Sequence, residues 1–233
     1  MGVLIPARDE ADYLAGCLRS VAVAAAASDL PVRAVVVLDS CTDESATVVD
    51  EVATELALDL VVLTSSAGSV GAARRAGARE LLRWSDPAHL WLASTDADSA
   101  VPAHWLTRQL RHAADGADLV AGTVEVEDWS QWPRQTRATY ERQYARHTEL
   151  EGHGHVHGAN LGIRGDVYRR IGGFAPAARN EDVELISRAR RHGVEVTWAL
   201  DLAVSTSSRR IGRAPNGFAG HLVGLATGPD ETS

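Results

Sequence analysis

Two aspartates stand one residue apart in the stretch LWLASTDADSAVP (residues 90–102), directly after a run typical of a buried strand. Neighbouring carboxylates repel each other unless a cation or a shared proton offsets their charge. Mg²⁺ is commonly held by one or two carboxylates together with substrate phosphates and water. Asp96 and Asp98 are therefore candidates for a divalent cation, Mg²⁺ or Mn²⁺, that carries a diphosphate. The alternative is that Asp98 or Ser99 caps a helix beginning near Pro102 while Asp96 is solvated.

The chain on both sides of this pair alternates between strand and helix patterns. Strands are expected at residues 2–5, 34–38, 60–63 and 90–93, and helices at residues 9–27, 71–84 and 102–114, with a further helix capped by Ser40 or Thr42. Four successive strand–helix units predict an α/β fold with a mostly parallel central sheet and helices on both faces. Ligands of such sheets bind outside the carboxyl ends of the strands. The polar segments PARDE, DSCTDES, TSSAGSVGAAR and STDADS should therefore line one crevice.

The pattern changes after about residue 117. A strand (DLVAGTVEVED), two helices over residues 136–152 and 181–191, and a second strand (VEVTWAL) are expected there. The Arg- and Ser-rich segment that follows, TSSRRIGRAPNG, is expected to be mobile. No internal repeat or low-complexity linker interrupts the chain, so we expect a single domain over residues 1–233.

The composition excludes some classes of protein. The 233 residues are 45% hydrophobic and carry a formal net charge of −8, which suits a globular domain and argues against bulk binding to nucleic acid. No signal-peptide pattern opens the chain, and the Ala-rich segment at residues 20–27 is too short for a membrane span, which takes about 20 residues. Cys17 and Cys41 lack metal-type spacing. We therefore expect a cytoplasmic protein with reduced cysteines and no integral membrane segment.

Glycine-rich phosphate loops are missing from the sequence. There is no G-x-x-x-x-G-K-[ST] motif, and no G-x-G-x-x-G follows the first strand. The phosphates of a ligand would then be held by a metal ion and by arginine. Arg74, in the first turns of the helix after SVGAAR, is placed for that role, unless it is an ordinary exposed helix arginine.

Six motifs follow one another in a recognisable order. They are IPARDE, DSCTDES, GAARRAG, STDADS, GANLGIR, and GGF with NEDVEL. In this order they resemble the family 2 glycosyltransferases of the GT-A fold, and the resemblance covers roughly residues 2–195. It implies a nucleotide-sugar-binding half at residues 1–116 and an acceptor-binding half at residues 117–233, ending in a flexible C-terminal tail.

The resemblance implies a role for each matching residue. Substrate binding would fall to Pro6, Ala7 and Glu10 of the first loop, Asp39 at the base, Arg74 near the diphosphate, Asp96, the loop residues Gly158, Ala159 and Asn160, and Glu181. Asp98 would bind the metal directly, with Asp96 directed towards the ribose or the metal-bound waters. Asp182 would be the catalytic base, although a residue at a helix start also serves to cap it.

The activity implied is a metal-dependent, inverting transfer of a sugar from a nucleoside-diphosphate sugar to a hydroxyl of a small or carrier-linked acceptor. In such a transfer a carboxylate must face the acceptor hydroxyl, and a metal neutralises charge on the departing diphosphate. Two alternatives stay open. One is a nucleotidyltransferase of related α/β fold, and the other is a catalytically inactive nucleotide-sugar-binding protein.

The family pattern is incomplete around the metal. Many relatives provide a metal-binding histidine just after the last strand, whereas this region reads DLAVSTSSRR. The metal would rely on Asp98, phosphate and water, or on His221. Three further histidines, His153, His155 and His157, would share one face of an extended segment and are candidates for Zn²⁺. Alternatively they make ordinary hydrogen bonds in a loop, or His157 helps to bind the acceptor.

Two further groups of side chains have open roles. Four aromatic residues, Trp129, Trp132, Tyr140 and Tyr144, are either a stacking wall for a sugar or ring, the core of the second half, or a contact in a homodimer. Three arginines of the tail, Arg209, Arg210 and Arg213, either close over the diphosphate as a lid or lie exposed.

Overall fold

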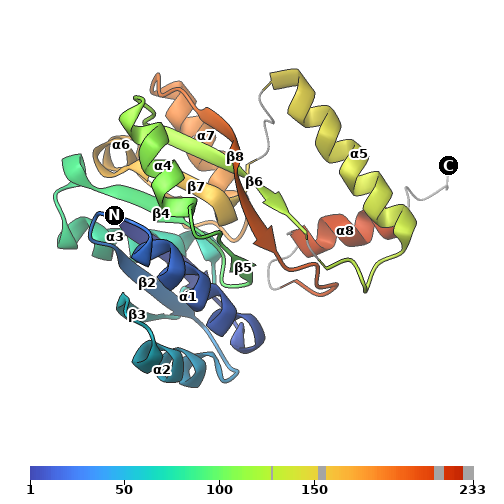
Figure 1. The fold of residues 1–233 in the computed structure, drawn as a ribbon, viewed down its shortest axis with the longest axis horizontal. Helices are drawn as coiled ribbons and strands as arrows, with labels where there is room; N and C mark the ends of the chain where they lie inside the picture. The colour runs from blue at the N-terminus through green and yellow to red at the C-terminus, as the bar shows by residue number, and fades with distance from the viewer. Residues whose placement is uncertain (127, 152–155, 213–217, 228–233) are drawn as a thin grey trace.

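The structure is a computed structural model that describes residues 1–126, 128–151, 156–212 and 218–227. An eight-stranded sheet runs through it in the order β3-β2-β1-β4-β7-β6-β8-β5 (Figure 1). The strands are β1 (Gly2–Ala7), β2 (Arg33–Asp39), β3 (Asp59–Ser65), β4 (Trp91–Ser94), β5 (Ser99–Ala100), β6 (Leu119–Glu125), β7 (Leu161–Arg164) and β8 (Thr197–Thr206). The helices are α1 (Ala11–Ala26), α2 (Ser45–Glu55), α3 (Val70–Trp84), α4 (Trp105–Ala114), α5 (Arg134–Glu151), α6 (Gly165–Arg170), α7 (Glu181–Arg191) and α8 (Phe218–Thr227), with short 3₁₀ turns η1 (Pro87–His89) and η2 (Gly158–Asn160).

The two halves of the sheet differ in strand direction. Strands β3, β2, β1 and β4 pair in parallel, as the strand–helix alternation predicts. Strand β7 then runs antiparallel to both β4 and β6, and β5 runs antiparallel to β8. The sheet is therefore mixed: its first half follows the predicted βα pattern, and its second half does not.

Successive side chains of the central strands point to opposite faces of the sheet, and an apolar core lies on each face. Val3 and Ile5 of β1 pack in the core beneath α1, α2 and α4. Leu4, between them, packs in the opposite core with Leu81 of α3 and Leu185 of α7. Period-2 alternation on a sheet covered by helices on both sides produces this division. The rigid central strands hold their carboxyl ends, and the loops that follow them, in fixed positions.

The expected starts of two helices are wrong. Helix α4 begins at Trp105, because residues 99–100 pair with β8 and a turn from Pro102 to Trp105 comes first. Helix α2 has no side-chain cap from Ser40 or Thr42; its first residue, Ser45, donates its backbone N–H to Asp43 Oδ1 at 3.0 Å.

The segment expected to be mobile covers residues 206–217, of which 213–217 lie outside the described residues, and its first residues are attached to the domain. Strand β8 extends to Thr206, well past the expected strand. The backbone N–H of Ser207 donates to the Asp98 carbonyl at 3.1 Å, and the Ser208 carbonyl accepts from Trp132 Nε1 at 2.5 Å. These hydrogen bonds fix residues 205–209 beside the crevice, so the expectation of mobility is wrong for them.

Helices α5 and α8 lie side by side at one end of the molecule, beyond the ends of β6 and β8 (Figure 1). Trp132, Tyr140 and Leu222 form a separate buried cluster between them, with Trp129 and Phe218 packed against it. Among the described residues, no helix has the length and hydropathy that a membrane crossing requires.

Candidate functional site

A cleft of about 670 Å³ opens where the central strands end. Its lining includes Pro6, Ala7, Glu10, Asp39, Arg74, Asp96, Asp98, Gly158, Ala159, Glu181 and Asp182. These residues come from loops after β1, β2 and β4, from α3, and from η2 and α7 in the second half. The position agrees with the rule that ligands of α/β sheets bind at the carboxyl ends of the strands. Apart from Asn160, every residue to which the family resemblance gives a role lines this one cleft.

Arg74 is the centre of a buried polar network. Helix α3 is capped by Ser69, whose Oγ accepts from the Ala72 backbone at 3.3 Å, and this start directs Arg74 into the domain, where it is 2% exposed. Its Nε donates to Ser94 Oγ at 3.1 Å, and its two terminal nitrogens form ion pairs with Asp96 and Glu181. The alternative of an exposed helix arginine is therefore wrong. Arg74 ties the β4 loop to α7 across the cleft.

Gly158 lies directly against this network. Its carbonyl accepts from Ser94 Oγ at 2.8 Å, and its backbone N–H donates to Asp182 Oδ2 at 2.8 Å. A Cβ at this position would lie 2.3 Å from Arg74 Nη2, so only glycine fits without a shift. The contact holds the Asp182 carboxylate at the cleft beside the η2 turn.

Helix α7 presents two adjacent carboxylates with different surroundings. Glu181 is buried, and burial raises its pKa while the Arg74 guanidinium opposes that rise. Asp182 is half-buried and lines the cleft. Both stand at the N-terminus of the helix, where the macrodipole favours negative charge. Asn180, in the left-handed region at φ 58°, makes the turn into the helix.

Asp98 and Glu10 share one arginine, Arg209. The guanidinium makes two hydrogen bonds to Glu10, at 2.5 and 2.7 Å, and lies 3.1 Å from Asp98 Oδ2. Burial, together with the charge of Asp96, raises the pKa of Asp98 to about 7, against the lowering effect of Arg209. Nothing in the local sequence links Arg209 to Glu10, which is 199 positions away.

The β1 and β2 loops form one part of the cleft lining. Asp39, at the end of β2, is 3% exposed, and its Oδ1 accepts from the Gly68 backbone at 3.1 Å. Arg8 reaches the same loop through a 3.3 Å hydrogen bond to the Gly68 carbonyl. Pro6 and Ala7 also belong to this part of the lining.

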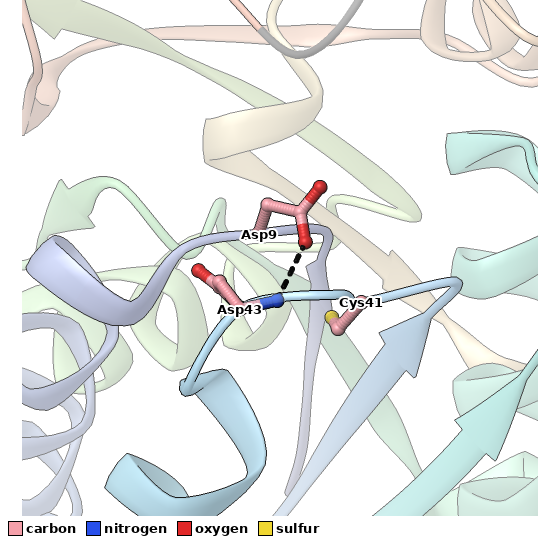
Figure 2. Close-up of side chains that lie close together, drawn as sticks. All are labelled: Asp9, Cys41 and Asp43. Carbon is pink, nitrogen blue, oxygen red and sulfur yellow. Dashed lines mark hydrogen bonds between the residues drawn. The ribbon is translucent and has the colours of Figure 1, made fainter.

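A second group of metal-type side chains lies in the same loops, outside the cleft lining. Asp9, Cys41 and Asp43 bring ligand atoms within 4.8 Å of one another, and Figure 2 shows Asp9 bonded to the Asp43 backbone. Asp9 Oδ1 also accepts a hydrogen bond from the Thr42 backbone at 2.6 Å. Asp9 therefore joins the β1 loop to the β2 loop, and this contact accounts for its position. A thiol is a poor ligand for Mg²⁺ or Mn²⁺. In contrast, Asp96 and Asp98 in the cleft offer the oxygen ligands that these ions prefer.

Asn160 does not face the cleft, contrary to its predicted role in substrate binding. It is fully buried, and its Oδ1 accepts from Trp105 Nε1 at 2.9 Å. Its Nδ2 donates to the Thr123 and Leu202 carbonyls, both at 2.8 Å. The side chain thus joins η2 to β6 and β8 and positions Gly158 and the following strand.

The aromatic group contributes to both a core and the cleft. Trp132 and Tyr140 are buried in the α5–α8 cluster, while Tyr140 and Tyr144 also line the cleft. Tyr144 stacks on His157, with ring centroids 6.3 Å apart. His221 of α8 lines the cleft as well. His153 and His155, and with them the proposed Zn²⁺ group, lie outside the described residues.

The tail arginines separate in the structure. Arg209 lies in the cleft, whereas the guanidinium of Arg210 stacks over the Trp132 ring at 5.2 Å. Arg213 lies outside the described residues. From the sequence, Arg209 is only one of three tail arginines with an open role. The signal available in the sequence is that these arginines follow shortly after a strand that ends at the crevice.

Comparison with solved structures shows the fold. Residues 1–349 of S. aureus TarS, in complex with UDP-GlcNAc, match with a TM-score of 0.66 at 15% identity, over 91% of this chain and 59% of that chain. The mannosyltransferase PcManGT from Pyrobaculum calidifontis, in complex with GDP-Man and Mn²⁺, matches with a TM-score of 0.60 at 20% identity, over 97% of this chain and 68% of that chain. M. tuberculosis glucosyl-3-phosphoglycerate synthase matches with a TM-score of 0.57 at 14% identity, over 97% and 76%.

The sequence comparisons show the family. No curated protein sequence matches this chain. The family model described as glycosyltransferase like family 2 matches residues 1–214, which is most of the chain. Together with the α/β sheet shared with the GT-A structures above, this match confirms the resemblance seen in the six motifs. The chain therefore belongs to glycosyltransferase-like family 2 and has the GT-A fold.

Proposed function

We propose that the domain transfers a sugar, with inversion, from a nucleoside-diphosphate sugar to a hydroxyl of a small or carrier-linked acceptor. The observation that carries the proposal is the Arg74 network. It joins Asp96, on the donor side after β4, to Glu181 and, through Gly158, to Asp182 on α7. Carboxylates suited to a metal-bound diphosphate and to an acceptor hydroxyl are thus held rigidly around one cleft.

The donor is assigned to the half formed by residues 1–116 and the acceptor to residues 117–233. Support comes from the cleft lining, to which the first half contributes Pro6, Ala7 and Asp39, and the second half contributes Asp182 and the tyrosines of α5. TarS was solved with UDP-GlcNAc and PcManGT with GDP-Man and Mn²⁺. A nucleotide sugar of that class is therefore the proposed donor here.

The proposed reaction has a simple balance of bonds and protons. An acceptor oxygen attacks the anomeric carbon, the bond from that carbon to the diphosphate breaks, and the hydroxyl proton passes to the Asp182 carboxylate. Attack opposite the leaving group inverts the anomeric centre. Glu181 stays paired with Arg74 and positions its neighbour Asp182.

The oxygen ligands at the cleft fit a divalent cation. Asp98 and Asp96 would hold Mg²⁺ or Mn²⁺, which prefer carboxylates, phosphate and water. When bound, the ion supplies positive charge that stabilises the departing diphosphate. We assign Asp98 as the direct ligand. Asp96, already paired with Arg74, acts on the ribose or the metal-bound waters.

A thermal-shift screen tests the proposal. UDP, GDP, dTDP and ADP, with their sugar conjugates, are added with and without Mn²⁺ or Mg²⁺, since a ligand of the native state raises Tm by mass action. We expect one nucleoside diphosphate to stabilise the protein with metal, and the shift to disappear in Asp98→Ala. No shift with any nucleotide would overturn the proposal.

Asp182→Asn then tests the chemistry. Loss of the base should lower the transfer rate by about 10²–10⁴-fold, while donor affinity stays the same. Glu184→Gln, at an exposed carboxylate of the same helix, is the matched control. Equal rates in Asp182→Asn and wild type would remove Asp182 as the base. The anomeric configuration of the product, read by NMR, decides between inversion and retention.

A further inference from the structure

Among the described residues that follow β8, Arg209 is the one whose side chain contacts carboxylates of the first half. It stands three residues after β8 and remains 16% exposed in its side chain. Its guanidinium is bonded to Glu10 through both terminal nitrogens and lies over the Tyr13 ring at 5.4 Å. The contact with Asp98, at 3.1 Å, is longer than either bond to Glu10.

The charges that line the cleft show which carboxylates Arg209 neutralises. The lining holds six carboxylates, from Glu10, Asp39, Asp96, Asp98, Glu181 and Asp182, and four arginines, Arg8, Arg74, Arg179 and Arg209. Arg74 is committed to Asp96 and Glu181 in a buried site. Arg209 is therefore the arginine that compensates the charge of Glu10 and Asp98. A divalent cation at Asp98 would compete for the oxygen that Arg209 faces, because two cations at one carboxylate repel each other.

We propose that Arg209 is an exchangeable counter-ion and a ligand of the donor's diphosphate. Without donor it neutralises Asp98 and Glu10. When a divalent cation binds Asp98, the guanidinium leaves Asp98, keeps its bonds to Glu10, and donates its remaining N–H groups to the diphosphate. This inference rests on the proposed function, since it takes a nucleoside diphosphate as the ligand.

The chemistry of the side chain favours such an exchange. A guanidinium has five N–H donors in a planar fork that suits carboxylate and phosphate equally well. Glu10 holds the fork by two short hydrogen bonds, so the longer Asp98 contact is the one that yields first. Partial exposure leaves one edge of the group open to the cleft.

The test compares metal binding with nucleotide binding in Arg209→Gln. Mn²⁺ affinity is measured by calorimetry on the protein without nucleotide, and the affinity for UDP or GDP is measured at saturating Mn²⁺. We expect Mn²⁺ to bind about tenfold more tightly, because its competitor is gone, and the nucleotide to bind about tenfold more weakly; each factor of ten equals about 1.4 kcal/mol. Arg210→Gln, at the neighbouring arginine on Trp132, should change neither affinity.

The two opposite changes make the proposal easy to contradict. Mn²⁺ affinity that stays the same or falls in Arg209→Gln would overturn the exchange at Asp98. Unchanged nucleotide affinity would overturn the contact with the diphosphate. If Arg209→Gln folds poorly, Arg209→Lys keeps one charge without the fork and should still weaken the nucleotide. Failure of wild type to bind any nucleotide would count against the proposed function, whereas the Mn²⁺ comparison alone still decides the exchange.

Discussion

Two arginine–carboxylate networks line the same cleft and are held in different ways. Arg74 is 2% exposed and contacts a hydroxyl and two carboxylates that belong to different parts of the fold. Arg209 is 16% exposed in its side chain and is held by Glu10 and Asp98 from the edge of the cleft. Each arginine therefore pairs with two carboxylates, but Arg74 is buried inside the domain and Arg209 is partly exposed.

The difference teaches how burial determines the role of an ion pair. Removing one partner of a buried ion pair leaves the other charge buried without compensation, which lowers the free energy of unfolding by about 3–5 kcal/mol. Closer to solvent, water and ions replace a lost partner, so the contribution of a pair falls towards about 0–1 kcal/mol. We infer that Arg74 fixes the geometry of the cleft, whereas Arg209 can change partners within it.

Removal of each arginine gives the largest contrast. Arg74→Ala should lower the free energy of unfolding by about 3–5 kcal/mol, because Glu181 and Asp96 lose their shared partner. Arg209→Gln should cost only about 1–2 kcal/mol, less than a fully buried pair. Urea denaturation at pH 7.5 measures both changes. Arg79→Ala, on the exposed face of the same helix as Arg74, should stay within about 0.5 kcal/mol.

Addition of Mn²⁺ sharpens this comparison. A cation that binds the native state stabilises it by mass action, so Mn²⁺ should recover stability in Arg209→Gln, where Asp98 is available. Arg74→Ala should recover little, because Asp98, the direct ligand, is still paired with Arg209 in that variant. An equal loss in the two variants, or equal recovery, would contradict the distinction between a fixed and an exchangeable arginine.

Gly158→Ala should perturb the Arg74 network alone. The added Cβ would lie 2.3 Å from Arg74 Nη2, so the guanidinium or the η2 turn must shift, at a cost of about 1–3 kcal/mol. Gly220→Ala is the control, because nothing lies within 4 Å of its Cβ and alanine favours a helix by up to about 1 kcal/mol.

Combining Gly158→Ala with Arg74→Ala tests whether the added Cβ clashes with the Arg74 guanidinium. In the Arg74→Ala background the obstructing guanidinium is gone, so Gly158→Ala should cost much less than in wild type. Interaction energies of this kind are expected for residues in contact. Additive losses would mean that the clash with Arg74 is not the source of the cost.

Much of this fold was predictable because local patterns determine it. Continuous apolar runs such as residues 34–38 become buried central strands, and the carboxyl ends of parallel strands must meet at one edge. The convergence of Asp39, Asp96 and Asp98 follows from that rule. The α7 carboxylates entered the prediction only through the family resemblance, since no periodicity places α7 beside β4.

The errors arose where contacts distant in sequence override local pattern. Asn160 looks like a loop residue, yet Trp105, 55 positions away, buries it. The stretch from Thr206 onwards is rich in Arg, Ser and Gly, which suggests mobility, yet the pairing of Thr206 with β5 and the hydrogen bonds of Ser207 and Arg209 hold its first residues in place. Composition does not report such pairing, because its partners lie about 100–200 residues earlier.

The smallest expected effects are those of Asp98→Asn and Asp96→Asn on the free energy of unfolding, and we expect them to have opposite signs. The pKa of Asp98 is raised to about 7, above its unfolded value near 3.8, through burial and the charge of Asp96. The native state then binds more protons than the unfolded state between these values, so Asp98 lowers stability as pH rises from about 4 to 7. Asp98→Asn should therefore be more stable than wild type at pH 8, by about 1–2 kcal/mol, and equal to it near pH 4.

Asp96→Asn should act in the opposite direction, although it changes a carboxylate only two positions away. Its charge compensates Arg74, which is buried and cannot lose its proton at ordinary pH. The variant should lose about 1 kcal/mol at pH 8, with the loss limited by the remaining Glu181 and by the partial exposure of Asp96. Urea denaturation of both variants at pH 5 and 8 measures the two effects. If both substitutions stabilise the protein at pH 8, simple repulsion between the two carboxylates explains the pair, and Arg74 does not depend on Asp96.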